Sequence, residues 1–117
     1  MKNLQKEYGL YINGKWQPAS DGATFKTYSP ATGKELAVCA EATREDVDAA
    51  VKAAHAAWES WKNTTPVERA VILNKIADII DANAQHLAEV ESLDNGKPIR
   101  ETGMIDIPMS ADHFRYF

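Results

Sequence analysis

With 117 residues, of which 44% are apolar and 26% charged, the chain has the size of one domain and the composition of a globular protein, which excludes a disordered tail. Its net charge is -4 and its 13 lysine and arginine side chains are scattered, so a nucleic-acid partner is not expected. No apolar run reaches the roughly 18 residues of a membrane-spanning helix, so no membrane partner is expected either.

The cysteine content and the first residues bear on the cellular compartment. Cys39 is the one cysteine of the sequence, so the chain cannot form an internal disulfide, as is usual in a reducing compartment. Residues 1–9 are polar and charged and lack the apolar stretch of a secretory signal. These features predict a cytoplasmic protein.

The first third of the chain has the pattern of short strands joined by tight turns. Asn13 and Gly14 separate the short runs Leu10–Ile12 and Lys15–Gln17. Such a pair predicts a hairpin, because both residues of the turn must tolerate positive φ.

Two more strands are predicted after this hairpin. A second turn falls at residues 21–22, and the alternating run Thr24–Tyr28 follows it. Proline and glycine in residues 29–33 interrupt the pattern, and residues 36–40 then predict another strand.

A helix is predicted to begin after Thr43, because its hydroxyl can cap the first turn while Asp46, three residues on, completes a capping box. Lys62 and Asn63 are predicted to close this helix. Its apolar residues recur at spacings of three and four, which places on one face Val47, Ala50, Val51, Ala54, Trp58 and Trp61.

Thr65, Pro66 and Glu68 form a very clear helix start, with a cap, a first-turn proline and a capping box. We expect one helix from here to about Leu93, ended by the glycine at position 96. Ile72 and Ile79 widen its apolar stripe, so it is predicted to be covered on more than one side. The stripe itself consists of Leu73, Ile76, Ala77, Ile80, Ala84 and Leu87.

The last part of the chain is again predicted to be helical, from about Ile99, with Pro108 near the start of a final helix. The sequence ends within an apolar helical segment, without a capping residue or a charged tail. We therefore expect a fragment of a longer protein. A natural terminus that is merely frayed is the alternative.

The candidate chemical groups do not combine into an active site. His55, His86 and His113 are far apart and lack the neighbouring ligands of a zinc site, so we interpret them as surface or interface residues. Cys39 lies within a predicted strand and is interpreted as a buried structural thiol rather than a nucleophile. We predict no catalytic and no coenzyme-binding residue in this chain.

Asp94 presents an electrostatic problem, because its carboxylate lies beside the predicted C-terminal end of a helix, where the partial charge is also negative. Lys97, a bound cation or an amide of a partner could compensate it. Residues 94–98 have too few glycines for a P-loop or a dinucleotide fingerprint, and taken alone they predict a helix cap and a turn.

Several segments together resemble the start of aldehyde dehydrogenases. Residues 11–16 resemble the opening hairpin of that family, and residues 29–34 its "NPATG" turn with serine in place of the usual asparagine. Residues 91–98 look like its most recognisable early motif. Residues 44–51 and 68–78 are similar to its first two helices.

The resemblance covers about residues 8–117 and implies an α+β fragment of an α/β fold. In the family fold, N-terminal β-hairpins precede two to three helices that flank a doubly wound coenzyme-binding sheet. Residues 1–117 would be the incomplete N-terminal part of that coenzyme-binding domain. The implied partner is the remainder of the dehydrogenase chain.

The resemblance also implies an activity for the whole enzyme, which oxidises an aldehyde to a carboxylic acid. In the family a cysteine forms a thiohemiacetal with the substrate and a hydride passes to NAD or NADP. The catalytic and coenzyme-binding motifs lie further along the family's chain, and Cys39 does not match the nucleophile's motif. The segment alone is therefore expected to be inactive and to bind no coenzyme.

Two finer expectations follow from the resemblance. Residues 97–102 and 112–117 look most like members that act on acetaldehyde and other short aliphatic aldehydes. Some members also hold a monovalent cation, K+ or Na+, and the matching positions here are Thr27, Tyr28 and Asp94, the first two through their backbone carbonyls. A water-filled turn is the alternative to that cation site.

Apolar helix faces around Leu73, Ile76, Ile80 and Phe114 would lack the sheet of the family fold in this segment. Because exposed apolar patches seek cover, we expect self-association into a homo-oligomer. The rival hypothesis is a non-enzymatic helical interaction module, or a truncated regulator that binds to itself or to a full-length dehydrogenase.

Overall fold

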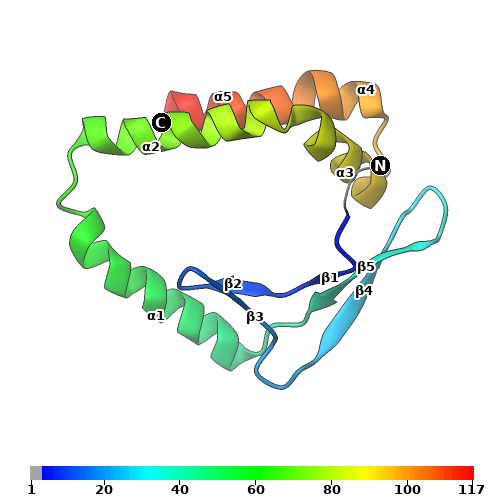
Figure 1. Ribbon diagram of the computed structural model, residues 1–117, viewed down its shortest axis with the longest axis horizontal. Coiled ribbons are helices and arrows are strands. Elements are labelled where there is room, and N and C mark those ends of the chain that lie inside the picture. The colour runs from blue at the N-terminus through cyan, green and yellow to red at the C-terminus, as the bar shows by residue number, and fades with distance from the viewer. Residues whose placement is uncertain (1–3) are drawn as a thin grey trace. The chain divides into compact units, whose positions relative to one another are not determined.

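The computed structural model describes residues 4–117, which form two compact units. One unit comprises residues 5–28 and 35–63, with all the strands and the first helix. The other comprises residues 29–34 and 64–117 together with Leu4, and it holds the remaining helices. Figure 1 shows these elements in chain order. The expected succession of N-terminal hairpins and then helices is confirmed.

The predicted first hairpin is present. Strands β2 (Leu10–Ile12) and β3 (Lys15–Gln17) pair antiparallel around a two-residue turn. Asn13 has φ 51° and Gly14 has φ 76°, the left-handed conformations that this turn requires. Next to the turn the hairpin is stabilised by a cross-strand contact of Tyr11 with Trp16, whose ring centroids are 5.0 Å apart.

The second sheet has the strand order β1-β5-β4. The two predicted strands, β4 (Thr24–Tyr28) and β5 (Glu35–Ala40), pair antiparallel with an irregularity between Thr27 and Tyr28. Strand β1 (Glu7–Tyr8) runs parallel to β5 on its other side. The sequence did not predict β1, because two residues are too few to show an alternating pattern.

Helix α1 (Arg44–Trp61) begins with the predicted capping box. The Thr43 hydroxyl accepts a hydrogen bond from the Asp46 amide at 3.2 Å, and the Asp46 carboxylate accepts one from the Thr43 amide at 3.0 Å. The same carboxylate also accepts a hydrogen bond from the Ser20 amide at 3.1 Å. Asp46 is only 5% exposed. Its hydrogen bonds therefore fix the start of the helix to the preceding loop.

The helical unit contains five consecutive helical elements, which are α2 (Pro66–Ala82), α3 (Ala84–Asn95), α4 (Ile99–Glu101), the π-helix η1 (Thr102–Asp106) and α5 (Ile107–Tyr116). Helices α2 and α5 lie side by side in Figure 1 and pack along each other. None of the helices in residues 4–117 is long and apolar enough to cross a bilayer.

The prediction of one helix from Thr65 to about Leu93 is wrong, because Asn83 separates α2 from α3. Asn83 has φ -113° and ψ 13°, outside the helical region. Its side-chain amide donates to the Ile79 carbonyl at 2.8 Å, and its backbone amide donates to the Ile80 carbonyl at 3.1 Å. An asparagine that bonds to nearby carbonyls in this way competes with the helix and ends it.

Small side chains form the closest contacts of the helical unit. Ala77 of α2 and Ala111 of α5 are fully buried, and Ala88 of α3 is 3% exposed. Thr102 in η1 is also fully buried. Its hydroxyl donates to the Ala88 carbonyl at 3.0 Å and lies 2.8 Å from the hydroxyl of Ser92, so the π-turn is fixed to α3.

Candidate functional site

Two of the segments that carry the family resemblance contact each other in the helical unit. Gly96 ends α3 in the left-handed conformation, with φ 81°, and its amide donates to the Ser92 carbonyl at 3.1 Å. Pro30, in the turn of residues 29–34, lies directly against this glycine. A Cβ atom at position 96 would be 2.9 Å from the Pro30 Cγ atom, so the contact requires glycine.

Lys97 follows this cap, but it does not compensate Asp94. Its Nζ atom forms an ion pair with Asp106, at 2.7 and 2.6 Å from the two carboxylate oxygens. The hydrogen bond to Asp106 raises the pKa of Lys97 above its usual value. Of the three groups that sequence analysis considered as counter-charges for Asp94, Lys97 is therefore excluded. Asp94 itself is exposed at the end of α3.

The other two residues of the predicted cation site lie at the end of β4. Thr27 is half-buried and Tyr28 is 53% exposed, and the strand pairing is irregular between them. An irregularity of this kind frees backbone groups from the regular ladder, which a carbonyl ligand requires. Thr27 and Tyr28 belong to the strand-containing unit and Asp94 to the helical unit, so binding of a cation by these three residues stays a prediction.

Residues with catalytic potential are separate from one another. Cys39 is half-buried in β5, where its register partners are Tyr8 of β1 and Phe25 of β4. Its position in a strand agrees with the sequence prediction, although its burial is only partial. Within residues 4–117 no three His, Cys, Asp or Glu side chains are grouped so that they could hold a metal ion.

All three histidines are exposed on helices, as the sequence analysis expected of surface residues. His55 lies on α1 and His86 on α3. His113, on α5, donates from its Nδ1 atom to the carbonyl of Met109, one turn earlier, at 2.6 Å. None of these side chains is placed as a general base beside a nucleophile within its own unit.

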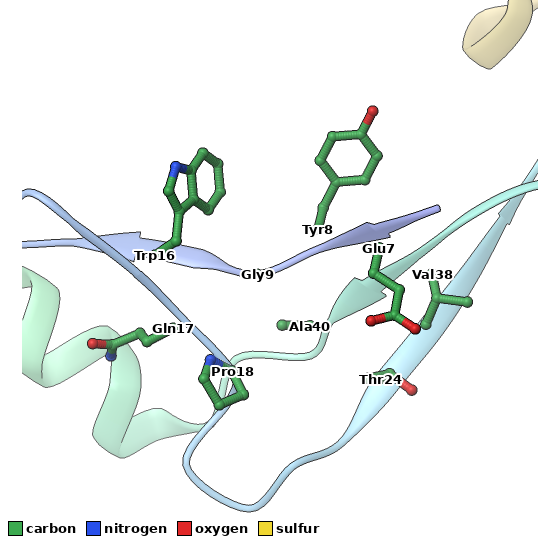
Figure 2. Close-up of a pocket in the computed structure, with 9 residues that line it drawn as sticks. All are labelled: Glu7, Tyr8, Gly9, Trp16, Gln17, Pro18, Thr24, Val38 and Ala40. Carbon is green, nitrogen blue, oxygen red and sulfur yellow. The ribbon is translucent and has the colours of Figure 1, made fainter. Parts of the chain in front are cut away.

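An open hollow of about 500 Å³ lies in the strand-containing unit and was not predicted. Figure 2 shows the rings of Tyr8 and Trp16 extending in the same direction, away from Pro18 and Thr24. Among the residues that line the hollow in the described part of the chain, Glu7 is the one that carries a carboxylate. The hollow depends on β1, which explains why sequence periodicity could not indicate it. Its other lining residues are polar but uncharged or apolar.

Gly9 permits the close approach of strands beside this hollow. A Cβ atom at position 9 would be 2.6 Å from the carbonyl oxygen of Gln17, a backbone atom that cannot move aside. Packing therefore restricts position 9, between β1 and β2, to glycine. The backbone conformation at this position does not itself require glycine.

Acidic residues on α2 have a partner far along the chain. Asp78 and Asp81 are both half or more exposed. In the structure Arg115 of α5 forms ion pairs with both, at 3.3 Å from the Asp78 carboxylate and in a shorter contact with Asp81. Because these partners are more than thirty residues apart in sequence, no local pattern could reveal the pairing.

Much of the apolar surface of the helical unit is open. On α2 the exposed fraction is 73% for Val67, 64% for Val71 and 54% for Ile79. The other large apolar side chains exposed in this unit include Ile72, Met104, Met109, Phe114, Tyr116 and Phe117. Since α5 covers only one side of α2, the expectation of a helix covered on more than one side is not met by the residues that the structure describes.

Comparison with known proteins gives one consistent result. Residues 16–117 match the family described as "Aldehyde dehydrogenase family". The chain is 53% identical over 114 residues to an aldehyde dehydrogenase of Rhodospirillum rubrum and 50% identical over 113 residues to acetaldehyde dehydrogenase 2 of Cupriavidus necator. These matches cover 97% of the chain and 22% of each relative.

Solved structures agree with the sequence matches. The chain superposes on the NAD+ complex of an aldehyde dehydrogenase from Bacillus cereus with a TM-score of 0.91 at 46% identity. The superposition covers 94% of this chain and 23% of that one. The chain thus spans less than a quarter of the length of each of these three proteins.

Proposed function

The chain belongs to the aldehyde dehydrogenase family, and from this premise we propose that it is the N-terminal part of the coenzyme-binding domain of an NAD(P)-dependent enzyme that oxidises aldehydes to carboxylic acids. The observation that carries the proposal is the continuous match of residues 16–117 to the family. The partner that follows from it is the remainder of such a dehydrogenase chain, since the relatives are more than four times longer.

The residues present do not fit a dinucleotide by themselves. The six glycines of the sequence do not form the G-x-G-x-x-G turn that receives a pyrophosphate, and no helix of either unit follows a parallel strand through such a turn. In the whole enzyme the coenzyme accepts the hydride. This chain contributes scaffold to that site, through the capped helices and the Pro30–Gly96 contact, and we expect no turnover from it alone.

A direct assay tests the expected inactivity. The purified 117-residue chain is titrated with NAD+ and NADP+ in a calorimeter and then incubated with acetaldehyde while NADH absorbance is followed. Neither binding nor reduction is expected. Measurable turnover would show that the chain carries its own catalytic groups, and the proposal would then fail.

Complementation tests the positive part of the proposal. The chain is mixed with a truncated aldehyde dehydrogenase that lacks the corresponding N-terminal segment. Restored oxidation of an aldehyde is expected, because separate pieces of one domain recover their interface when both fold. If the pieces bind but stay inactive, the rival function gains support, namely an interaction module or regulator that associates with itself or with a full-length dehydrogenase. The exposed apolar residues of α2 are the observation that favours this rival.

Short aliphatic aldehydes are the proposed substrates of the whole enzyme. The support is the resemblance of residues 97–102 and 112–117 to members acting on such aldehydes, together with the name of the relative in Cupriavidus necator. In the complemented enzyme, kcat/KM for acetaldehyde is expected to exceed that for benzaldehyde. The reverse order would contradict this substrate class without affecting the family assignment.

A monovalent cation, K+ or Na+, is the proposed ligand of Thr27, Tyr28 and Asp94. Its support is the match of these positions to the family's cation ligands, the strand irregularity at Thr27 and the lack of compensation of Asp94 by Lys97. We expect KCl or NaCl to raise the melting temperature more than an equal concentration of tetramethylammonium chloride. Asp94→Asn should remove that difference. Equal effects of the three salts would contradict the site.

Self-association and location complete the proposal. We expect homo-oligomers, because apolar side chains of α2 and α5 are exposed in the helical unit.

A cytoplasmic location is supported by the lone Cys39, because a single cysteine cannot form an internal disulfide. Fractionation of expressing cells with an antibody to the chain tests the location.

A further inference from the structure

The sequence contains two Asn-Gly pairs, Asn13-Gly14 and Asn95-Gly96. The two pairs differ in their hydrogen bonds and in their surroundings in the structure. In any polypeptide this pair is chemically labile, because glycine lacks the side chain that would hinder its nitrogen from approaching the asparagine side chain. The two pairs therefore provide an internal comparison of one reaction in two structural settings.

The reaction is deamidation, and it involves no oxidant or reductant. The backbone nitrogen of the glycine attacks the asparagine Cγ atom, an N–Cγ bond forms, and the Cγ–Nδ2 bond breaks. The amide group leaves as ammonia, taking up the proton that the glycine nitrogen lost. Water then opens the resulting succinimide ring at either carbonyl and yields aspartate or isoaspartate. The step requires a glycine N–H free of other bonds and a side-chain amide free to rotate.

Asn95 meets neither requirement. The Gly96 amide already donates to the Ser92 carbonyl at 3.1 Å as part of the helix cap. The Asn95 side chain is held at both ends, since its Oδ1 atom accepts from the Lys97 amide at 2.7 Å and its Nδ2 atom donates to Glu91. The Pro30 ring against Gly96 hinders rotation of this segment.

Asn13 meets both requirements. It lies with Gly14 at the exposed tip of the β2–β3 hairpin. Within residues 4–117 neither the Asn13 side-chain amide nor the Gly14 N–H makes a hydrogen bond, as expected of the central residues of a two-residue turn. No atom outside the immediate chain lies within 4 Å of the position of a Cβ on Gly14, so the ring has room to form.

We propose that Asn13 is a site of spontaneous deamidation in the folded chain and that the fold protects Asn95. The product at position 13 carries a new negative charge. In the isoaspartate form the backbone also runs through Cγ, which adds one methylene to a turn of two residues. The hairpin tip faces a row of alanines on α1, which includes Ala50 and Ala54, across an open hollow of about 360 Å³. Modification would therefore loosen the hairpin from α1.

Ageing the folded chain at mildly alkaline pH tests the proposal. Peptide mass mapping reports the amide-to-acid conversion at each asparagine, and labelling by an isoaspartyl methyltransferase reports the isoaspartate. Three hydrogen bonds hold the Asn95-Gly96 pair, and each that must break first slows the reaction by about twofold to tenfold, so Asn13 should react at least about tenfold faster than Asn95. In guanidinium chloride the two rates should become similar, because both asparagines precede glycine.

The variant Asn13→Gly is the matched control, since glycine accepts the positive φ of position 13 and cannot deamidate. It should abolish the isoaspartate label that maps to position 13, leave any label from the Asp21-Gly22 pair in place, and leave the rate at Asn95 unchanged. A folded chain in which Asn95 reacts as fast as Asn13 would overturn the proposal. So would a folded chain in which neither asparagine reacts while both react in denaturant.

Discussion

The ring of Pro30 lies against Gly96 so closely that no other residue fits at position 96 without a shift. The glycine also has φ 81°, a conformation that residues with a side chain rarely adopt. Two separate physical requirements, backbone conformation and close approach, therefore coincide at one residue. The contact joins the turn of residues 29–34 to the end of α3, far away in sequence.

We predict that Gly96→Ala destabilises the chain more than a typical glycine substitution. The left-handed conformation costs an alanine about 1–2 kcal/mol, and overpacking against Pro30 adds about 1–3 kcal/mol. Urea denaturation followed by circular dichroism measures the change in free energy of unfolding. Gly33→Ala is the matched control, because Gly33 has φ 69° but no neighbour within 4 Å of its Cβ position, so it should show only the first cost. Equal losses for both variants would mean that the Pro30 contact contributes nothing.

Thr102 gives a second prediction, since it is a buried hydroxyl with protein partners in α3. Thr102→Val keeps the shape but leaves the Ser92 hydroxyl without this partner, and should cost about 1–3 kcal/mol. Thr102→Ser keeps the hydroxyl, loses one methyl group and should cost only about 1 kcal/mol. Thermal and urea denaturation of the three proteins give the order. A valine variant as stable as the parent chain would show that the hydrogen bonds of the π-turn are dispensable.

The features that sequence predicted are those set by neighbouring residues. Both capping boxes, Thr43 with Asp46 and Thr65 with Glu68, span three positions and formed as expected. The hairpin turn at residues 13–14 is equally local. In each case the side chains that define the structure lie within one turn of the backbone they fix, so a short stretch of sequence contains the whole cause.

The features that sequence missed depend on distant partners or on competition between neighbours. Strand β1 exists because it pairs with β5, about thirty residues later. The ion pairs of Arg115 with α2 require the two helices to pack first. The break at Asn83 is local, yet an asparagine is tolerated in many helices, so its identity alone could not predict the break. For the candidate cation site, the residues came from the sequence resemblance. The structure shows the local environment of Thr27 and Tyr28 in one unit and of Asp94 in the other.

Asp46 predicts a pH dependence of stability. Hydrogen bonds from the backbone amides of Ser20 and Thr43 hold the pKa of this carboxyl below its usual value. A group with a lowered pKa in the folded state stabilises the fold at pH values above its unfolded pKa of about 3.9, and this contribution is lost as the pH falls through the folded value. The chain should therefore lose stability below about pH 4, partly through protonation of Asp46.

The variant Asp46→Asn isolates this contribution. At neutral pH it should be less stable than the parent chain, because a neutral amide accepts the two backbone hydrogen bonds more weakly. The difference between the two proteins should shrink as the pH falls below about 4, where the parent carboxyl is itself neutralised. Urea midpoints at several pH values provide the test. A difference that stays constant with pH would show that the charge of Asp46 is irrelevant. Glu68→Gln gives the same comparison at the second capping box.

The exposed apolar side of α2 leads to a prediction about association. Ile79 is 54% exposed, with Ile72 one heptad earlier on the same side of the helix. Ile79→Lys should weaken self-association of the chain, because it replaces apolar area by a charge that must stay hydrated. Its effect on the stability of the separate chain should stay within about 0.5 kcal/mol, as for most surface substitutions. Sedimentation velocity over a range of concentrations measures the association.

The control for Ile79→Lys must add the same charge without removing apolar surface. Asn74→Lys does so, because Asn74 is exposed on the same helix and its side chain bonds only to the Ala70 carbonyl of its own preceding turn. If association depends on apolar contact at Ile79, the first variant should weaken it and the second should leave it nearly unchanged. Equal weakening would point to charge repulsion as the cause. A parent chain that stays monomeric at the highest concentrations would remove the basis for self-association altogether, because the exposed residues of α2 would then tolerate water without a partner.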